Sequence, residues 1–203
     1  MTKKRYYLDY LLKTDEFPQS LYHQAKHKMV KDFLNHYRRG AIILDAGCGA
    51  GNITGKYAEK YKLYGIDEQK SAIDYCKRNY QGIYRQSSLY KIVFPGNYFE
   101  AILLLDTIEH LEKPTLALLE LKRVLKPNGK IHICTINYAN PLWFVLENTW
   151  HRCCGGNCRT YQKEIHPTRY TKELLRKHCQ GIFKEIRMQT KVFNMELFYI
   201  GQK

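Results

Sequence analysis

Residues 42–52 read I-I-L-D-A-G-C-G-A-G-N, an apolar run that ends in an acid and is followed by glycines at alternate positions. The glycines are Gly47, Gly49 and Gly51, and the acid is Asp45. A strand, a glycine-rich turn and a following helix form the nucleotide-binding unit of open α/β sheets. Glycine suits this turn because it tolerates positive φ and lets a ligand approach the backbone. The stretch therefore predicts a cofactor site in an α/β fold.

The acids near this turn favour a ligand other than a pyrophosphate. Asp45 lies just before the glycines, where a carboxylate is a good partner for an ammonium or sulfonium cation. A second strand-like run, L-Y-G-I-D at residues 63–67, ends in Asp67, and residues 45 and 67 are 22 positions apart. This separation is close to the roughly 20 residues expected for a carboxylate that binds ribose hydroxyls. Asp67 is therefore the predicted ribose ligand.

Two further segments accompany the glycine turn and Asp67. They are L-L-L-D-T-I-E-H-L at residues 103–111 and R-V-L-K-P-N-G-K at residues 123–130. Together with D-A-G-C-G-A-G-N and Y-G-I-D, they resemble the class I S-adenosylmethionine-dependent methyltransferases, type 11 branch, which includes ubiquinone-biosynthesis O-methyltransferases. The resemblance covers residues 20–136 closely and the remainder loosely. It implies S-adenosylmethionine as the cofactor and a Rossmann-like, seven-stranded, mostly parallel sheet with helices on both faces and a C-terminal antiparallel strand pair.

The resemblance also implies a role for each residue of the glycine turn. Gly47 and Gly49 would let the methionine portion of the cofactor lie on the backbone, and Gly51 completes the turn. Asp45 would act indirectly, near the amino group of the cofactor or through the loop.

Cofactor contacts are also expected after the third and fourth strands. Relatives often carry an aspartate after the third strand that contacts the adenine amine, whereas this chain has Ser87, followed by Ser88 and Leu89. A serine hydroxyl accepts a hydrogen bond from an amine more weakly than a carboxylate does, and Leu89 can pack on the adenine ring. Asp106, at the end of the apolar run 99–105, is the last expected cofactor contact.

Methyl transfer needs a base only if the acceptor must lose a proton first. His110 is the candidate for this proton transfer, with Glu109 beside it, because both follow the central strand at its carboxyl end. The alternative is that this pair shapes the pocket or binds the cofactor.

Residues 137–167 form the least regular part of the chain and are interpreted as a lid-like insertion over the active site. The lid interpretation assigns Trp143, Trp150 and His166 to the acceptor side of the pocket. Residues 166–171 resemble a segment that lies near the acceptor pocket in this methyltransferase branch, which implies the same side for Tyr170. The segment 140–146 is strongly apolar and basic residues follow it, so the lid could face either a substrate or an anionic membrane surface.

The cysteines do not indicate a metal centre. The lid contains one cluster of potential ligands: His151, Cys153, Cys154, Cys158 and His166. Cys154 and Cys158 have the spacing of a zinc-ligand pair, but no second such pair exists in the sequence, so we predict no metal. Four other cysteines are interpreted as small core residues: Cys48, Cys76, Cys134 and Cys179.

The whole chain is expected to be a single domain, 1–203, with N-terminal cap helices over residues 1–40. Apolar positions at steps of four predict a helix over 19–39. Further helices are expected at 52–61, 69–79, 114–125 and 170–178. Strands are expected at 41–44, 62–66, 83–86, 99–105, 130–135, 183–190 and 193–201, with a turn at 127–129.

Composition constrains the partners of the protein. The formal net charge of +14 over 203 residues favours anionic partners such as nucleic acid, lipid headgroups or acidic substrates, or else a solvated basic surface. No signal peptide or membrane span is visible, so a cytoplasmic protein with reduced cysteines is expected, with weak contact to an anionic membrane surface as an option.

The expected activity is methyl transfer to a small-molecule or lipid-like acceptor. One rival is an RNA methyltransferase, which the charge supports. D-T-I-E-H stands where base-modifying relatives commonly carry an Asn/Asp-Pro-Pro-aromatic motif, so specific nucleic-acid recognition is not expected. A second rival is a cofactor-binding regulatory protein without catalysis.

Overall fold

The computed structural model describes residues 19–148 and 166–203. In these ranges one sheet contains seven strands in the order β3-β2-β1-β4-β5-β7-β6. They are β1 (Ile42–Ala46), β2 (Lys62–Asp67), β3 (Ile83–Gln86), β4 (Phe99–Leu105), β5 (Leu125–Ile136), β6 (Lys184–Lys191) and β7 (Glu196–Gln202). The strands β1 to β5 pair in parallel, and β7 pairs antiparallel with both β5 and β6. This topology confirms the predicted sheet and its closing antiparallel pair.

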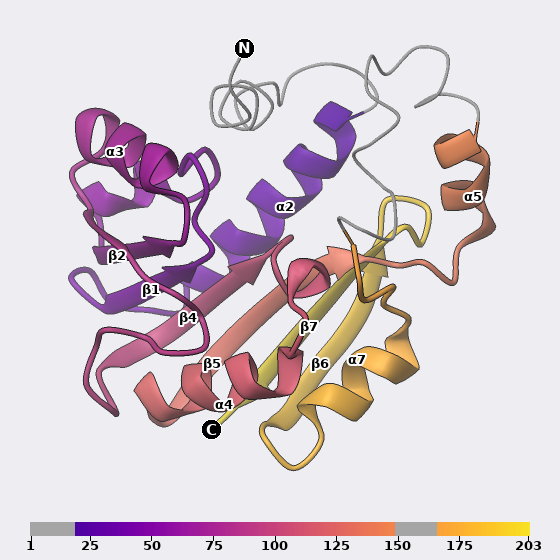
Figure 1. The fold of residues 1–203 in the computed structure, drawn as a ribbon. Coiled ribbons are helices and arrows are strands. Elements are labelled where there is room, and N and C mark those ends of the chain that lie inside the picture. Colours follow the sequence, from indigo (N-terminus) through magenta and orange to yellow (C-terminus); the bar gives the residue numbers. More distant parts are fainter. Residues whose placement is uncertain (1–18, 149–165) are drawn as a thin grey trace.

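Helices cover both faces of the sheet (Figure 1). The described helices are α2 (Gln19–Leu34), α3 (Lys70–Asn79), α4 (Pro114–Val124), α5 (Pro141–Asn148) and α7 (Lys172–Cys179), with 3₁₀ turns η1 (Gly55–Glu59) and η2 (Ile108–His110). The helices α4 and α7 pack on one face in the largest apolar cluster, and α2 packs on the opposite face in a second cluster.

Strand β4 shows why the sequence produces two cores. Successive side chains of a strand point to opposite faces. Ile102 and Leu104 accordingly join the core under α4, whereas Leu103 and Leu105 join the core under α2. A nearly continuous apolar run is therefore required here, because both faces of this central strand are buried.

The strand order reverses beside β1, which pairs with both β2 and β4. In open α/β sheets, ligands bind outside the carboxyl ends of the strands at such a switch point. The glycine turn follows β1 directly, so the fold places this turn where a cofactor is expected.

Several predicted boundaries are wrong for identifiable reasons. Only the 3₁₀ turn η1 forms where a helix was expected over 52–61. Thr54 occupies the N-cap position of η1 but makes no cap hydrogen bond, because its hydroxyl donates to Asp45 instead. The expected strand 193–201 begins at Glu196, because Val192, Phe193 and Asn194 all have positive φ and form the turn before it.

Two further differences concern β5 and the proposed lid. Strand β5 extends through residues 127–129, where a turn was expected. The strand is irregular there, since Asn128 adopts φ 61° and the pairing with β4 shifts register nearby. The segment expected to be irregular contains helix α5, and its residues 149–165 lie outside the described part of the chain, as do residues 1–18 of the expected N-terminal cap.

Candidate active site at the carboxyl ends of the strands

The glycine turn needs its glycines for backbone geometry and for space. Gly47, Gly49 and Gly51 have φ values of 75°, 51° and 73°, in the left-handed region that other residues rarely adopt. A Cβ atom on Gly47 would lie 2.4 Å from Oγ1 of Thr107, so the turn packs directly against the residues that follow β4. The structure thus brings the ends of β1 and β4 together around a bare backbone.

Asp67 connects the end of β2 to this turn. Its carboxylate accepts hydrogen bonds from the backbone N–H groups of Gly49, at 2.9 Å, and of Gln69, at 2.8 Å. Burial raises the pKa of Asp67, and the two backbone hydrogen bonds act in the opposite direction. Asp67, the predicted ribose ligand, therefore lies beside the glycines.

Asp45 lies beneath the turn. It is 3 % exposed and accepts a hydrogen bond from the hydroxyl of Thr54. Burial raises its pKa to about 7. The side chain of Asp45 therefore supports the loop from inside.

The residues after β3 reach the same region through backbone contacts. The N–H of Ser87 donates to the carbonyl of Asp67 at 3.0 Å, while its hydroxyl lies 3.4 Å from the carbonyl of Lys91. The hydroxyl of Ser88 accepts from the N–H of Tyr90. Leu89 is 6 % exposed and belongs to the main core, so it contributes to the wall of the site mainly through packing.

Asp106 follows β4 with φ 46° and forms an ion pair with Lys26 of α2. Its backbone N–H donates to the carbonyl of Cys134 at 3.0 Å. Both the backbone and the side chain of Asp106 are therefore held by neighbouring elements, one by β5 and the other by α2.

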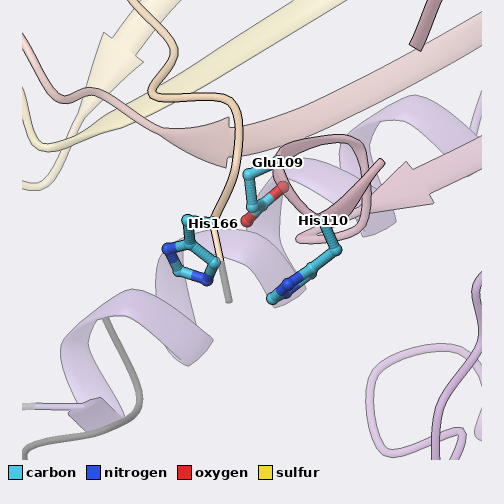
Figure 2. A group of neighbouring side chains, drawn as sticks. All are labelled: Glu109, His110 and His166. Carbon is cyan, nitrogen blue, oxygen red and sulfur yellow. The ribbon is translucent and has the colours of Figure 1, made fainter. Parts of the chain in front are cut away.

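Glu109 and His110 lie in η2, and His166 comes from the segment before α7; the three side chains face one another (Figure 2). One ligand-type atom from each lies within 4.8 Å of the others. The rings of His110 and His166 are edge to face with centroids 4.6 Å apart. Carboxylate and imidazole groups at this spacing could share a proton or bind a divalent cation.

The protonation of this cluster follows from its burial. Glu109 is 1 % exposed, and burial together with nearby Asp106 raises its pKa to about 8. Its carboxyl accepts a hydrogen bond from Thr135 at 2.9 Å. Burial and His110 lower the pKa of His166 to about 3, and its Nδ1 lies 2.5 Å from the hydroxyl of Tyr138. At neutral pH, His166 is therefore a neutral imidazole and Glu109 is largely protonated.

Two of the predicted acceptor-side residues occupy core positions. The indole N–H of Trp143 is buried and donates to the carbonyl of Met195 at 3.0 Å. Tyr170 is fully buried in the main core, with its hydroxyl 3.0 Å from Nδ1 of His178. Of the three acceptor-side residues that the structure describes, only His166 lies with His110. Trp150 falls outside the described residues, as do the lid cysteines.

The sequence interpretation missed Lys26 and Glu196. Lys26 lies next to Ala25 in the apolar stripe of α2, and Glu196 is a single acid in the apolar run M-E-L-F-Y-I. Both are almost completely buried, with exposures of 5 % and 2 %. A charge inside an apolar periodic pattern is the signal that would have identified them, since such groups are rarely buried without a partner.

The fold and the site together define a class of protein. The strand order, the glycine turn at the switch point and an acid at the end of β2 form the cofactor site of class I methyltransferases. The chain fits S-adenosylmethionine, because the left-handed glycines leave the backbone accessible and the carboxylate of Asp67 lies beside them.

Comparison with known proteins agrees with this class. Residues 44–133 match the family described as Methyltransferase domain, in its type 11 branch. An uncharacterized methyltransferase of Schizosaccharomyces pombe is 32 % identical over 113 residues, covering 48 % of this chain and 41 % of that protein. A ubiquinone biosynthesis O-methyltransferase of Bartonella tribocorum is 27 % identical over 153 residues, covering 71 % and 62 %. Over residues 44–133 the chain is therefore similar to the type 11 methyltransferase domain, in agreement with a class I S-adenosylmethionine-dependent enzyme.

The same fold occurs in solved structures. A SAM-dependent methyltransferase from Aquifex aeolicus superimposes with a TM-score of 0.68 at 22 % identity, covering 100 % of this chain and 99 % of that one. At this identity the likeness concerns the fold. The chain spans less than two thirds of the length of the two curated relatives, at 41 % and 62 %.

Proposed function

We propose that this protein transfers a methyl group from S-adenosylmethionine to a small-molecule or lipid-like acceptor. One observation carries the proposal: the cofactor-type turn and the Glu109–His110–His166 cluster both follow strands at the carboxyl edge of the same sheet. Ligands of open α/β sheets bind at this edge. A histidine that can accept a proton beside a cofactor turn, here His110, is what methylation of an acidic hydroxyl, amine or carbon acid needs.

The chain binds and orients the cofactor through the glycine turn and Asp67. When bound, S-adenosylmethionine supplies an electrophilic methyl group on a sulfonium centre. The protein contributes mainly alignment, because an in-line displacement needs the acceptor atom held close to the methyl carbon. Asp67 holds the N–H of Gly49, and Asp45 holds the hydroxyl of Thr54. These contacts fix the turn, so little reorganisation of the turn is required when the cofactor binds.

His110 is the proposed base. It is exposed on η2 and can receive a proton from an acceptor on a ring nitrogen. The neutral state of His166 favours this step, since a charged neighbour would oppose the imidazolium that forms on His110. Glu109 is largely protonated at neutral pH, so the proposed role of this residue is to shape the pocket and orient η2 through Thr135.

The acceptor side is proposed to include His166 and the lid of residues 137–167, with Trp143 of the lid and Tyr170, just before α7, in supporting positions. A lipid-like acceptor and weak contact with an anionic membrane surface remain part of the proposal, as does a cytoplasmic location. The lipid and membrane parts of the proposal are supported by the apolar side chains Leu142 and Val145 of α5, which are 46 % and 50 % exposed. The net charge of +14 supports contact with an anionic surface.

An acceptor screen with labelled cofactor tests the activity, and two variants separate its steps. Asp67→Ala should weaken cofactor binding by about 1.5–3 kcal/mol, because it removes charge-assisted hydrogen bonds, while Asp74→Ala on the surface of α3 should not. His110→Ala should lower turnover about 10²- to 10⁴-fold with cofactor affinity unchanged. The matched control is His36→Ala, an exposed histidine just after α2.

The outcomes distinguish the rivals. Cofactor binding without turnover on any acceptor would favour the regulatory protein. Unchanged affinity in folded Asp67→Ala would exclude this residue as a cofactor ligand. Full turnover in His110→Ala would exclude this residue as the base.

A further inference from the structure

Lys26 is a buried ammonium that joins three elements. Its side chain is only 6 % exposed, although lysine is almost never buried without a charged partner. The Nζ atom donates to the carboxylate of Asp106 at the end of β4 and lies 3.8 Å from Oε1 of Glu196 at the start of β7. Helix α2 is thereby bound through one side chain to the carboxyl end of the sheet.

The charges around Lys26 explain why the ammonium is retained. Burial alone would lower the pKa of Lys26, but Asp106 and Glu196 outweigh this effect and raise it. The thiol of Cys134 donates to Glu196 at 3.2 Å and lies 3.8 Å from Asp106, so it bridges the two acids. Removing the ammonium would leave the buried carboxyl group of Glu196 facing the partly buried one of Asp106, an arrangement that is unfavourable.

Asp106 links this ion pair to the cofactor turn. Its backbone has φ 46°, a conformation that a non-glycine residue keeps only when its surroundings hold it. The next residue is Thr107, whose hydroxyl lies 3.4 Å from the carbonyl of Gly47 and fills the space that a Cβ there would need. Thr107 therefore connects Asp106 directly to the glycine turn.

We propose that Lys26 is a positioning residue for the cofactor site: its ion pair with Asp106 holds the end of β4 against the glycine turn and fixes α2 over the same edge of the sheet. The inference rests on the proposed function, since it assigns S-adenosylmethionine to that turn. Lys26 acts through Asp106 and Thr107 and makes no contact of its own with the cofactor.

The test compares three variants of the full chain by calorimetric titration with S-adenosylmethionine and with its neutral product, S-adenosylhomocysteine. Lys26→Met should raise the dissociation constant of both about tenfold or more, because the turn loses its support. Lys26→Arg keeps the positive charge and should restore most of the affinity. Lys28→Met is the matched control, since Lys28 is exposed on the same helix and pairs only at the surface with Asp32.

A purely structural role would give a different result. In that case Lys26→Met would lower the unfolding temperature while the folded protein kept its wild-type dissociation constants, and the proposal would be overturned. If Lys26→Met does not fold, the double variant Lys26→Met/Asp106→Asn removes both charges together. We expect it to fold and to bind weakly, and wild-type affinity in this variant would also overturn the proposal.

The binding measurement is independent of turnover. A wild-type protein that binds S-adenosylmethionine but methylates no acceptor would contradict the proposed function and leave the role of Lys26 fully testable. A wild-type protein that binds neither probe would overturn both.

Discussion

At the scale of the residue, Asp45 is a buried acid that supports the cofactor turn, and its contribution to the stability of the fold depends on pH. Its carboxyl is fully buried under the glycines, and its pKa rises from the ordinary value of 3.8 to about 7. Between these two values the unfolded chain has released the proton and the folded protein still holds it. The stabilising contribution of Asp45 is therefore fully present below about pH 4 and is lost as the pH rises towards 7.

Asp45→Asn removes this titration and can still accept the hydrogen bond from Thr54. We expect the unfolding free energy of the variant to exceed that of wild type, and the difference should grow by about 1–3 kcal/mol as the pH rises from about 5 to about 8. Urea unfolding at three pH values measures this difference. Asp74→Asn, an exposed acid on α3, serves as the control and should show no such trend. A pH-independent difference for Asp45→Asn would contradict the raised pKa.

Residues of the cofactor turn could be predicted from the sequence, whereas the proton-transfer cluster could be predicted only in part. Gly47, Gly49 and Asp67 act within local motifs whose spacing is visible along the chain. His166 reaches His110 only through the fold, from 56 positions away, so no local pattern could pair the two rings. Lys26 was missed for the same reason: its partners are 80 and 170 positions away.

At the scale of the element, helix α5 is fastened to the turn between β6 and β7. Trp143 donates from its indole N–H to the carbonyl of Met195, and the side-chain amides of Asn137 and Asn140 donate to the carbonyls of Asn194 and Phe193. Three donors from one segment thus satisfy three consecutive carbonyls of a turn whose residues 192–194 have positive φ. The turn holds this conformation because the segment 137–143, which leads into α5, supplies its hydrogen bonds.

Trp143→Phe removes one of these donors, while the carbonyl of Met195 still accepts from the backbone N–H of Asn137 at 2.8 Å. We expect a loss of about 0.5–1.5 kcal/mol in unfolding free energy, the net value of one hydrogen bond, measured by denaturant titration. Leu142→Ala is the control on the same helix, because that side chain is 46 % exposed and should change stability by less than about 0.5 kcal/mol. Equal losses in both variants would show that α5 is stabilised by its own helix and not by this anchor.

Elements with strong periodicity were predicted well, and those decided by tertiary contacts were not. The limits of β3 and the start of α4 agree with the sequence because Gly82 and Pro114 mark them locally. The expected helix after the glycine turn fails because Thr54 is used by Asp45. Helix α5 was not predicted, and its segment was interpreted as irregular. The residues that anchor this helix, such as Met195, are distant in the chain, so no local pattern indicated it.

At the scale of the whole molecule, the excess of basic residues bears on the partners of the protein. The formal net charge is +14, and none of the described helices is both long and apolar enough to cross a bilayer. A basic surface binds nucleic acid through phosphate contacts whatever the enzyme modifies. Charge alone therefore does not distinguish an RNA substrate from incidental binding.

We expect total tRNA to bind weakly, with affinity falling at least about tenfold between about 50 and about 200 mM salt, and to accept no methyl groups. Filter binding at several salt concentrations and incorporation of label from the cofactor measure the two properties. Heparin should compete as effectively as tRNA if only charge is recognised. Robust methylation of the RNA would overturn the small-acceptor proposal.

The position of β7 has a consequence for how the protein is made. This strand follows β6 in the sequence but lies between β5 and β6 in the sheet, so β6 emerges from the ribosome before the strand that it pairs with. Until residues 196–202 have been translated, β6 has no place in the sheet and the edge of β5 stays open. An open edge can pair with strands of other chains. A chain that stops before residue 196 would therefore keep this edge open and be prone to aggregate.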